Sequence, residues 1–173
     1  DNEKERYIPG IYDSVEVVLS GTPHIVNVQV APDLDRRQAR VRTEVKNAGS
    51  AKAARLHFTV REWRSGKVVA QMDAKPATLG PNQEQTIEVT IPLRNCHFWS
   101  PEDPFLYTVE ASTGADALTT RFGMRSFRCE AGQEPGAGRA YLNGKVYYLR
   151  GSNVTLYRFF EDAERGALPW DRE

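Results

Sequence analysis

ARVRTEVK, at residues 39–46, alternates small or apolar side chains with charged ones. Successive side chains of a β-strand point to opposite faces, so this stretch predicts a strand with every second residue from Ala39 to Val45 on one face. The charged residues then occupy the other face. Such a strand is half-buried, with its uncharged face toward a core. The following residues, Asn47-Ala48-Gly49-Ser50, favour a turn.

The same alternation recurs along most of the chain. It predicts further strands at residues 25–30, 55–63, 67–70, 87–91, 105–111, 117–122 and 124–129. We expect Pro32 to end the first of these, Ser65-Gly66 to form a hairpin turn, and residues 76–82 to form a loop. No helical periodicity of useful length appears between residues 12 and 130. Short strands separated by turn signals predict an all-β, antiparallel sandwich of two sheets.

The character of the sequence changes after residue 130. Residues 130–138 are small and Gly-rich, which predicts a boundary, and Asn143-Gly144 then predicts the tight turn of a hairpin within residues 141–151. The charged start without an initiator Met and the charged end at residues 170–173 lead us to expect a piece of a longer protein. We therefore expect residues 1–20 to end a preceding domain or linker, residues 21–130 to form the sandwich, and residues 131–173 to begin another domain.

The charge balance excludes two classes of partner. Lys plus Arg and Asp plus Glu number 23 each, so the chain has no net positive field for nucleic acid or an anionic membrane surface. The apolar runs are too short to span a bilayer, and no signal segment assigns a compartment. Cys96 and Cys129 do not bracket a Trp as in antibody-type domains, so two inert thiols are favoured over a disulfide.

Two motifs lie near the end of the expected sandwich: FWSPEDPFLY at residues 98–107 and RFGMR at residues 121–125. Pro101 and Pro104 restrict the backbone of a turn, and Tyr107 falls on an inward position. Trp99 is expected to cover one end of the core, with an exposed sugar platform as the alternative. The structural signature residues are Trp99, Pro101, Glu102, Pro104, Tyr107, Phe122, Gly123 and Arg125.

These motifs, with two others, resemble glycoside hydrolase family 2, which includes β-galactosidases, β-glucuronidases and β-mannosidases. The FWSPEDPFLY and RFGMR pair is similar to the signature of that family's immunoglobulin-like domain. GIYDSVEV at residues 10–17 resembles the last strand of its N-terminal sugar-binding jelly roll. LNGK at residues 142–145 with LRGSN at residues 149–153 resembles the hairpin and first strand of its catalytic TIM barrel. The resemblance implies an immunoglobulin-like sandwich followed by the start of an incomplete barrel.

The resemblance also implies a role. The chain would be a non-catalytic connecting domain between jelly-roll and TIM-barrel partners, in a parent enzyme that binds carbohydrate and hydrolyses β-glycosidic bonds with retention. Arg150 and Asn153 would border the parent's sugar pocket, although strand-end capping is an equal alternative. Val154-Thr155-Leu156 departs from the basic or His residues often found next, so no sugar is assigned.

No catalytic residue is expected within this chain. Retaining glycosidases use two carboxylates about 5–5.5 Å apart. In the resembled family the acid/base follows an Asn, and the one Asn-Glu here, Asn2-Glu3, lies in the charged leading segment. The segment after the Gly-rich boundary is also far shorter than the roughly 250 residues of a TIM barrel.

We expect neither a metal nor a cofactor. His24, His57 and His97 are far apart in sequence, and Asp33-Leu34-Asp35 lacks the further ligands of a calcium loop. Two alternative functions remain open: an independent carbohydrate-binding module, which exposed aromatic side chains would favour, and a fibronectin-like adhesion domain, which a long uncovered edge strand would favour.

Overall fold

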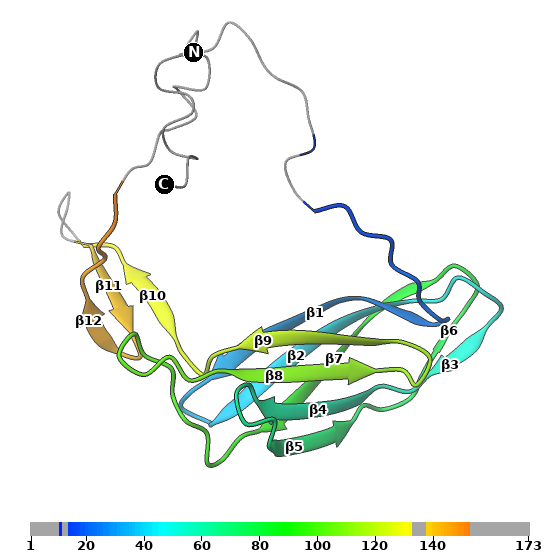
Figure 1. Cartoon of the computed structure of the whole chain (residues 1–173), viewed down its shortest axis with the longest axis horizontal. Coiled ribbons are helices and arrows are strands. Elements are labelled where there is room, and N and C mark those ends of the chain that lie inside the picture. The colour runs from blue at the N-terminus through cyan, green and yellow to red at the C-terminus, as the bar shows by residue number, and fades with distance from the viewer. Residues whose placement is uncertain (1–10, 12–13, 133–137, 153–173) are drawn as a thin grey trace, which may run out of the picture. The chain divides into compact units, whose positions relative to one another are not determined.

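The computed structural model describes residues 11, 14–132 and 138–152. In this part of the chain all regular elements are β-strands (Figure 1). None of these residues belongs to a helix long and apolar enough to cross a bilayer. The strands are β1 (His24–Asp33), β2 (Gln38–Lys46), β3 (Lys52–Ala54), β4 (His57–Glu62), β5 (Val68–Asp73), β6 (Ala77–Leu79), β7 (Glu84–Pro92), β8 (Tyr107–Ser112), β9 (Ala117–Phe122), β10 (Phe127–Glu130), β11 (Arg139–Leu142) and β12 (Lys145–Tyr147).

Two antiparallel sheets form the sandwich. One has the strand order β1-β2-β7 and the other has the order β5-β4-β8-β9. In Figure 1 the four-stranded sheet lies in front of the three-stranded one. The short strands β3 and β6 pair with each other at one end. This arrangement confirms the predicted all-β, immunoglobulin-like sandwich.

The core lies between the two sheets, and the alternation in β2 determines which side chains enter it. Ala39, Val41, Thr43 and Val45 are all completely buried, as predicted. Phe58 and Val60 of β4 reach the same core from the opposite sheet and are completely buried too. Each fully buried large apolar side chain contributes about 1.5–3 kcal/mol. Burial of alternate side chains is therefore the main stabilising term of the fold.

A buried amide organises the turn that follows β2. The Asn47 side chain is completely buried. Its Nδ2 donates hydrogen bonds to the carbonyl oxygens of Ser50 at 2.7 Å and Gly80 at 3.0 Å, and its Oδ1 accepts one from the Gly49 N–H at 3.2 Å. Buried polar groups are stable only when they are hydrogen-bonded. Asn47 therefore fixes the predicted change of chain direction after β2.

Several sequence-based boundaries are wrong. β1 does not end at Pro32, because this residue pairs with Ala39 and the strand continues to Asp33. β1 lies at the edge of its sheet, where the missing proline N–H costs no ladder hydrogen bond. β8 begins at Tyr107, two residues later than expected. The loop at 76–82 contains β6, a strand too short to produce a recognisable alternation.

The segment 124–129 is also different from the prediction, which made it the last strand of the sandwich. Met124 forms only an isolated parallel bridge with Phe98. β10, which begins at Phe127, pairs with β11, and β11 pairs with β12. These three strands form a sheet separate from the two sandwich sheets and from the β3–β6 pair, and we call it the third sheet. The predicted hairpin at Asn143-Gly144 is confirmed: both residues have positive φ, 50° and 78°, as a two-residue type I′ turn requires.

A charge in the core should unfold the sandwich. We expect Val41→Asp to lower the free energy of unfolding by more than about 4 kcal/mol, because a carboxylate at this completely buried site has no partner. Urea denaturation followed by circular dichroism measures the change.

Arg40→Asp is the matched control, because it introduces the same carboxylate at the adjacent, exposed position of β2. Its midpoint should stay close to that of the unmodified chain. Equal midpoints for the two variants would contradict the assignment of the buried face.

Candidate functional site

The signature motif at residues 98–107 forms a closed turn. The Ser100 N–H donates to the Asp103 carbonyl at 3.0 Å, and the Asp103 N–H donates to Ser100 Oγ at 3.1 Å. Pro101 sits inside this turn, where it has no N–H that would need a partner. Pro101, Glu102 and Pro104 are all exposed. Pro101 therefore restricts the backbone inside the turn, Pro104 follows it, and both contribute little to the core because they are exposed.

Aromatic rings anchor the turn to the end of the core. Phe105 stacks on His97 with ring centroids 4.6 Å apart and meets Tyr107 edge-on at 5.1 Å. Tyr107 in turn stacks on Phe122 at 5.7 Å. Pairs in these arrangements are stabilising beyond the apolar area that they bury. The row of rings connects the exposed turn to the buried residues at this end of the core.

Tyr107 has a polar contact as well as an inward ring. It is 3% exposed, and its hydroxyl oxygen accepts a hydrogen bond from the His97 N–H at 2.7 Å. Burial raises the pKa of the Tyr107 hydroxyl above its ordinary value, against the smaller opposing effect of that hydrogen bond. The hydroxyl therefore stays protonated and is an unsuitable general base near neutral pH.

Trp99 packs against the second signature motif. Its backbone N–H donates a hydrogen bond to the Met124 carbonyl at 3.0 Å. A Cβ atom added at Gly123 would lie 3.0 Å from both Cβ and Cγ of Trp99, so a larger residue at 123 would displace the indole. The Arg125 guanidinium lies over the ring, 4.6 Å from its centroid. Trp99 is half-buried, and its side chain lies against Gly123 as well as under this cation, so the geometry favours packing over a sugar platform.

Asn143 adds a contact that the sequence did not predict. Its Nδ2 donates to the Trp99 carbonyl at 2.8 Å, and its Oδ1 accepts from the Ser126 N–H at 3.0 Å. Its own N–H donates to the Ser126 carbonyl at 2.9 Å. The tip of the β11–β12 hairpin is thus bonded to the first signature motif and to Ser126, the residue that follows the second. We call this cluster, made of Trp99, Gly123–Ser126 and Asn143, the Trp99 joint.

Sequence reasoning identified Asn143 as a turn residue only. Asn is favoured there because it tolerates positive φ, and that property says nothing about where its side chain points. The sequence did contain one indication of this contact, because Asn143 lies in LNGK, one of the motifs that accompany the FWSPEDPFLY and RFGMR pair. The physical link between these motifs became visible only in the structure.

The remaining sequence-predicted residues lie apart from the joint. Arg150 is exposed. Asn153, Asn2-Glu3 and Val154-Thr155-Leu156 lie outside the described residues. Within those residues no cluster of three or more His, Cys, Asp and Glu side chains could hold a metal ion. The Asp33 carboxylate instead accepts hydrogen bonds from the Arg36 N–H and side chain, and the backbone bond is the main reason that the pKa of Asp33 is lowered.

The two cysteines are free in the structure. Cys129 is exposed on β10, whereas Cys96 is half-buried. Burial raises the pKa of the Cys96 thiol, and the nearby Arg37 opposes this effect. A raised pKa lowers the thiolate fraction at neutral pH, which is the opposite of what a nucleophilic cysteine needs.

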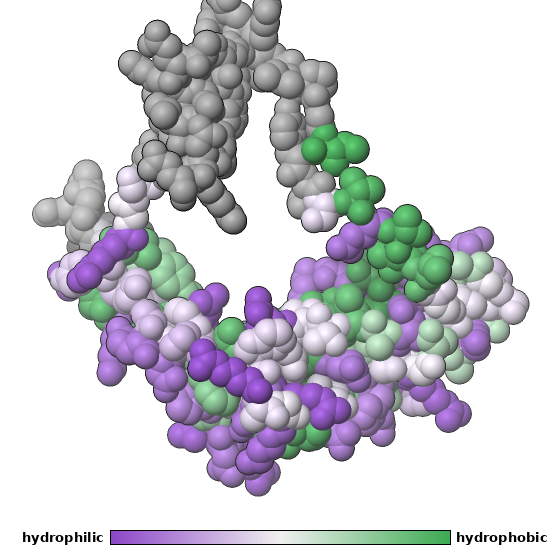
Figure 2. Space-filling model, viewed as in Figure 1, coloured by the Kyte–Doolittle hydropathy of each residue, from purple (hydrophilic) through white to green (hydrophobic). Residues whose placement is uncertain are grey.

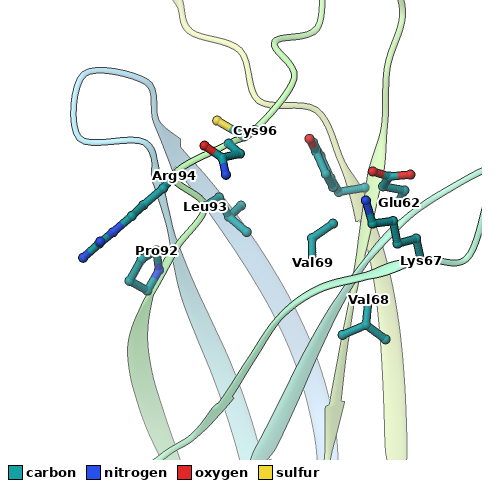
Figure 3. Close-up of a pocket in the computed structure, with 10 residues that line it drawn as sticks. Glu62, Lys67, Val68, Val69, Pro92, Leu93, Arg94 and Cys96 are labelled. Carbon is teal, nitrogen blue, oxygen red and sulfur yellow. The ribbon is translucent and has the colours of Figure 1, made fainter.

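A groove of about 480 Å³ opens beside Tyr107, between the end of β7 and the β4–β5 hairpin (Figure 3). In Figure 3, Glu62, Lys67 and Val69 lie on one side, and Leu93 and Cys96 lie across from them. Glu62 contributes the one carboxylate of the lining. Retaining hydrolysis needs a pair of carboxylates at about 5–5.5 Å, so this groove does not have the groups for that reaction.

Removing the Asn143 side chain should loosen the Trp99 joint. Asn143→Gly keeps a residue that accepts positive φ but loses the bonds to the Trp99 carbonyl and the Ser126 N–H. We expect a loss of about 1–2 kcal/mol of stability and faster hydrogen exchange at the Ser126 amide. NMR-detected exchange measures this directly.

Asn82→Gly is the matched control, because Asn82 also has positive φ, at 54°, and is exposed in a turn. Its effect on the Ser126 amide should be negligible. Unchanged Ser126 protection in Asn143→Gly would show that the joint is held by something else.

Comparison with known proteins agrees with this geometry. Residues 23–125, more than half of the chain, match glycosyl hydrolases family 2. A curated β-galactosidase of Staphylococcus xylosus is 25% identical over 146 residues, which are 83% of this chain. The chain spans only 13% of the length of that relative.

Solved structures show the same fold at low identity. A glycosyl hydrolase family 2 member from Bacteroides cellulosilyticus superimposes with a TM-score of 0.60 at 19% identity, covering 76% of this chain and 19% of that one. A β-galacturonidase from Eisenbergiella tayi bound to galacturonate gives 0.58 at 22% identity, with coverages of 72% and 21%. A Bacteroides uniformis β-glucuronidase gives 0.57 at 22% identity, with coverages of 76% and 17%. From the family match and this shared fold, we conclude that the chain belongs to glycosyl hydrolases family 2.

Proposed function

We propose that this chain is a non-catalytic connecting domain of a larger family 2 glycoside hydrolase. The observation that carries the proposal is the bonding of Asn143 to Trp99 and Ser126. Three hydrogen bonds from one residue couple the sandwich motifs to the hairpin that follows them. A connecting domain needs such a coupling, because its work is to hold its neighbours at a fixed angle.

The surface of the third sheet supports the proposal that another domain follows the sandwich. The register puts Phe127 opposite Leu142, and Ala140 opposite Tyr147, so these four residues share one face. Phe127 is 53% exposed and Tyr147 is 36% exposed. Figure 2 shows hydrophobic surface on this sheet. We propose that residues 131–173 are a linker and the first segment of a TIM barrel, and that the rest of the barrel covers this apolar face.

A second apolar segment supports the proposal that another domain precedes the sandwich. Residues 14–20 have no regular secondary structure, and Val15, Val17 and Leu19 are 75–91% exposed. Valines and leucines that point into water are typical of a segment whose partner is another domain. We propose that residues 1–20 belong to the end of a sugar-binding jelly roll or its linker, and that residues 21–130 are the connecting sandwich.

For the parent enzyme we propose retaining hydrolysis of β-glycosidic bonds in a carbohydrate. The names of the relatives, β-galactosidase, β-galacturonidase and β-glucuronidase, support this class of reaction and leave the sugar open. Arg150 and Asn153 are proposed to border the sugar pocket of the parent, with strand-end capping as the alternative. The exposure of Arg150 is compatible with either role.

The chain by itself should show no turnover. Incubation with chromogenic β-galactoside, β-glucuronide and β-mannoside, followed by absorbance, should give the rate of the buffer alone, because both catalytic carboxylates are proposed to lie elsewhere in the parent. Heat-denatured chain is the control for background release. Saturable release of the chromophore above that control would overturn the non-catalytic assignment.

A further inference from the structure

Trp63 is the more exposed of the two tryptophans in the described part of the chain. Its side chain follows the end of β4 and is 49% exposed, whereas Trp99 is half-buried under Arg125. The backbone N–H of Trp63 donates a hydrogen bond to the Leu106 carbonyl at 2.9 Å. This bond extends the pairing of β4 with β8 by one step. The backbone at Trp63 is therefore held by the sheet.

The outer face of the four-stranded sheet supports the ring from one side. Arg61 pairs with Thr108, which pairs with Arg121, so these residues lie in one row across the sheet. Trp63 is two residues beyond Arg61 and thus emerges on the same face. The Arg121 guanidinium lies over the indole at 4.7 Å from its centroid. A cation–π contact of this kind holds an exposed ring in one orientation.

A groove of about 310 Å³ lies beside this ring. It runs between the β4–β5 turn and the segment that leads into β8, and it lies within the size range of small-ligand sites. Its lining combines an indole, two carboxylates, a guanidinium, a hydroxyl and apolar side chains: Glu62, Trp63, Arg64, Ser65, Asp103, Pro104, Phe105 and Leu106.

The two carboxylates of the groove are held in place by neighbours. Glu62 Oε2 accepts a hydrogen bond from Ser65 Oγ at 2.5 Å. Asp103 Oδ2 lies 2.5 Å from His97 Nε2, and His97 is itself stacked on Phe105. A carboxylate has about four lone-pair sites, so each retains acceptor capacity after one such contact. The groove thus offers fixed hydrogen-bond acceptors next to an aromatic face.

We propose that the Trp63 groove binds a neutral sugar ring. A pyranose has an apolar face of C–H groups, which packs on an indole, and a rim of hydroxyls, which donate to carboxylates. Glu62 and Asp103 in the lining would repel the carboxylate of a uronic acid, so an uncharged sugar fits better. This site goes beyond the connecting role and does not depend on it.

The other groove is a weaker candidate for a sugar. The groove of Figure 3 has one carboxylate, that of Glu62, and its one aromatic residue, Tyr107, is 3% exposed. A buried ring offers no face for stacking. Lys67 lines that groove and not the Trp63 groove, which makes it a useful control position.

The test is a titration of the ¹⁵N-labelled chain with lactose and with methyl β-galactopyranoside, followed by NMR. We expect saturable shifts of the Trp63 indole N–H and of the backbone amides of residues 62–65, 103, 105 and 106. Trp63→Ala should weaken the apparent affinity by about tenfold or more, and Trp63→Phe should weaken it less because a ring remains. Glucuronate should bind more weakly than the neutral sugars.

Lys67→Ala is the control and should leave the affinity unchanged. Trp63→Phe and Asp103→Asn keep the test decisive if Trp63→Ala does not fold, because both should still weaken binding in a folded chain. Asp103 lines the Trp63 groove and not the groove of Figure 3. Two results would overturn the proposal: no saturable shift with any of these sugars, or shifts centred on Lys67 and Cys96 that persist in Trp63→Phe. Neither result bears on whether the chain turns over glycosides.

Discussion

Burial of alternate side chains between the two sheets is the constraint on which the rest of the structure depends. β2 supplies four completely buried residues to this layer, and Phe58 and Val60 meet them from the other sheet. Strand order, edge positions and the ends of the core follow from that layer. Tyr107 and Phe122, at one end of it, are both buried and stacked, and they give the signature turn a fixed base. The exposed parts of the chain that carry function are positioned by this base.

The Trp99 joint is the contact on which the proposed connecting role depends. Gly123 allows the indole to approach, Arg125 covers it, and Asn143 connects its backbone to the next hairpin. The hydrogen bond from Asn143 to the Trp99 carbonyl is short and directional, and it links residues 44 positions apart. Hydrogen bonds of this kind restrict orientation more than they add stability, because each contributes only about 1 kcal/mol net. The contacts of these motif residues are therefore explained by the geometry of the turn and the hairpin.

Much of the fold could be predicted from the sequence, because alternation over six to ten residues reports burial directly. Residues 39–46 and 117–122 are examples in which the predicted strand and the observed one agree closely. β10 could not be assigned to its sheet, since its four residues are all exposed and their alternation fits any partner. The partners of Asn143 and the exposure of Trp63 depend on where distant segments meet. For the same reason the sequence drew attention to Trp99 as a possible sugar platform and passed over Trp63.

The central claim is that the sandwich and the third sheet act as one oriented unit through the Trp99 joint. Residual dipolar couplings of backbone amides, measured in a weakly aligned sample of this chain, test it most directly. The account predicts that couplings from strands β1–β9 and from strands β10–β12 fit a single alignment tensor. Two tensors that differ in magnitude, with a smaller one for β10–β12, would mean that the sheet reorients independently and would contradict the account.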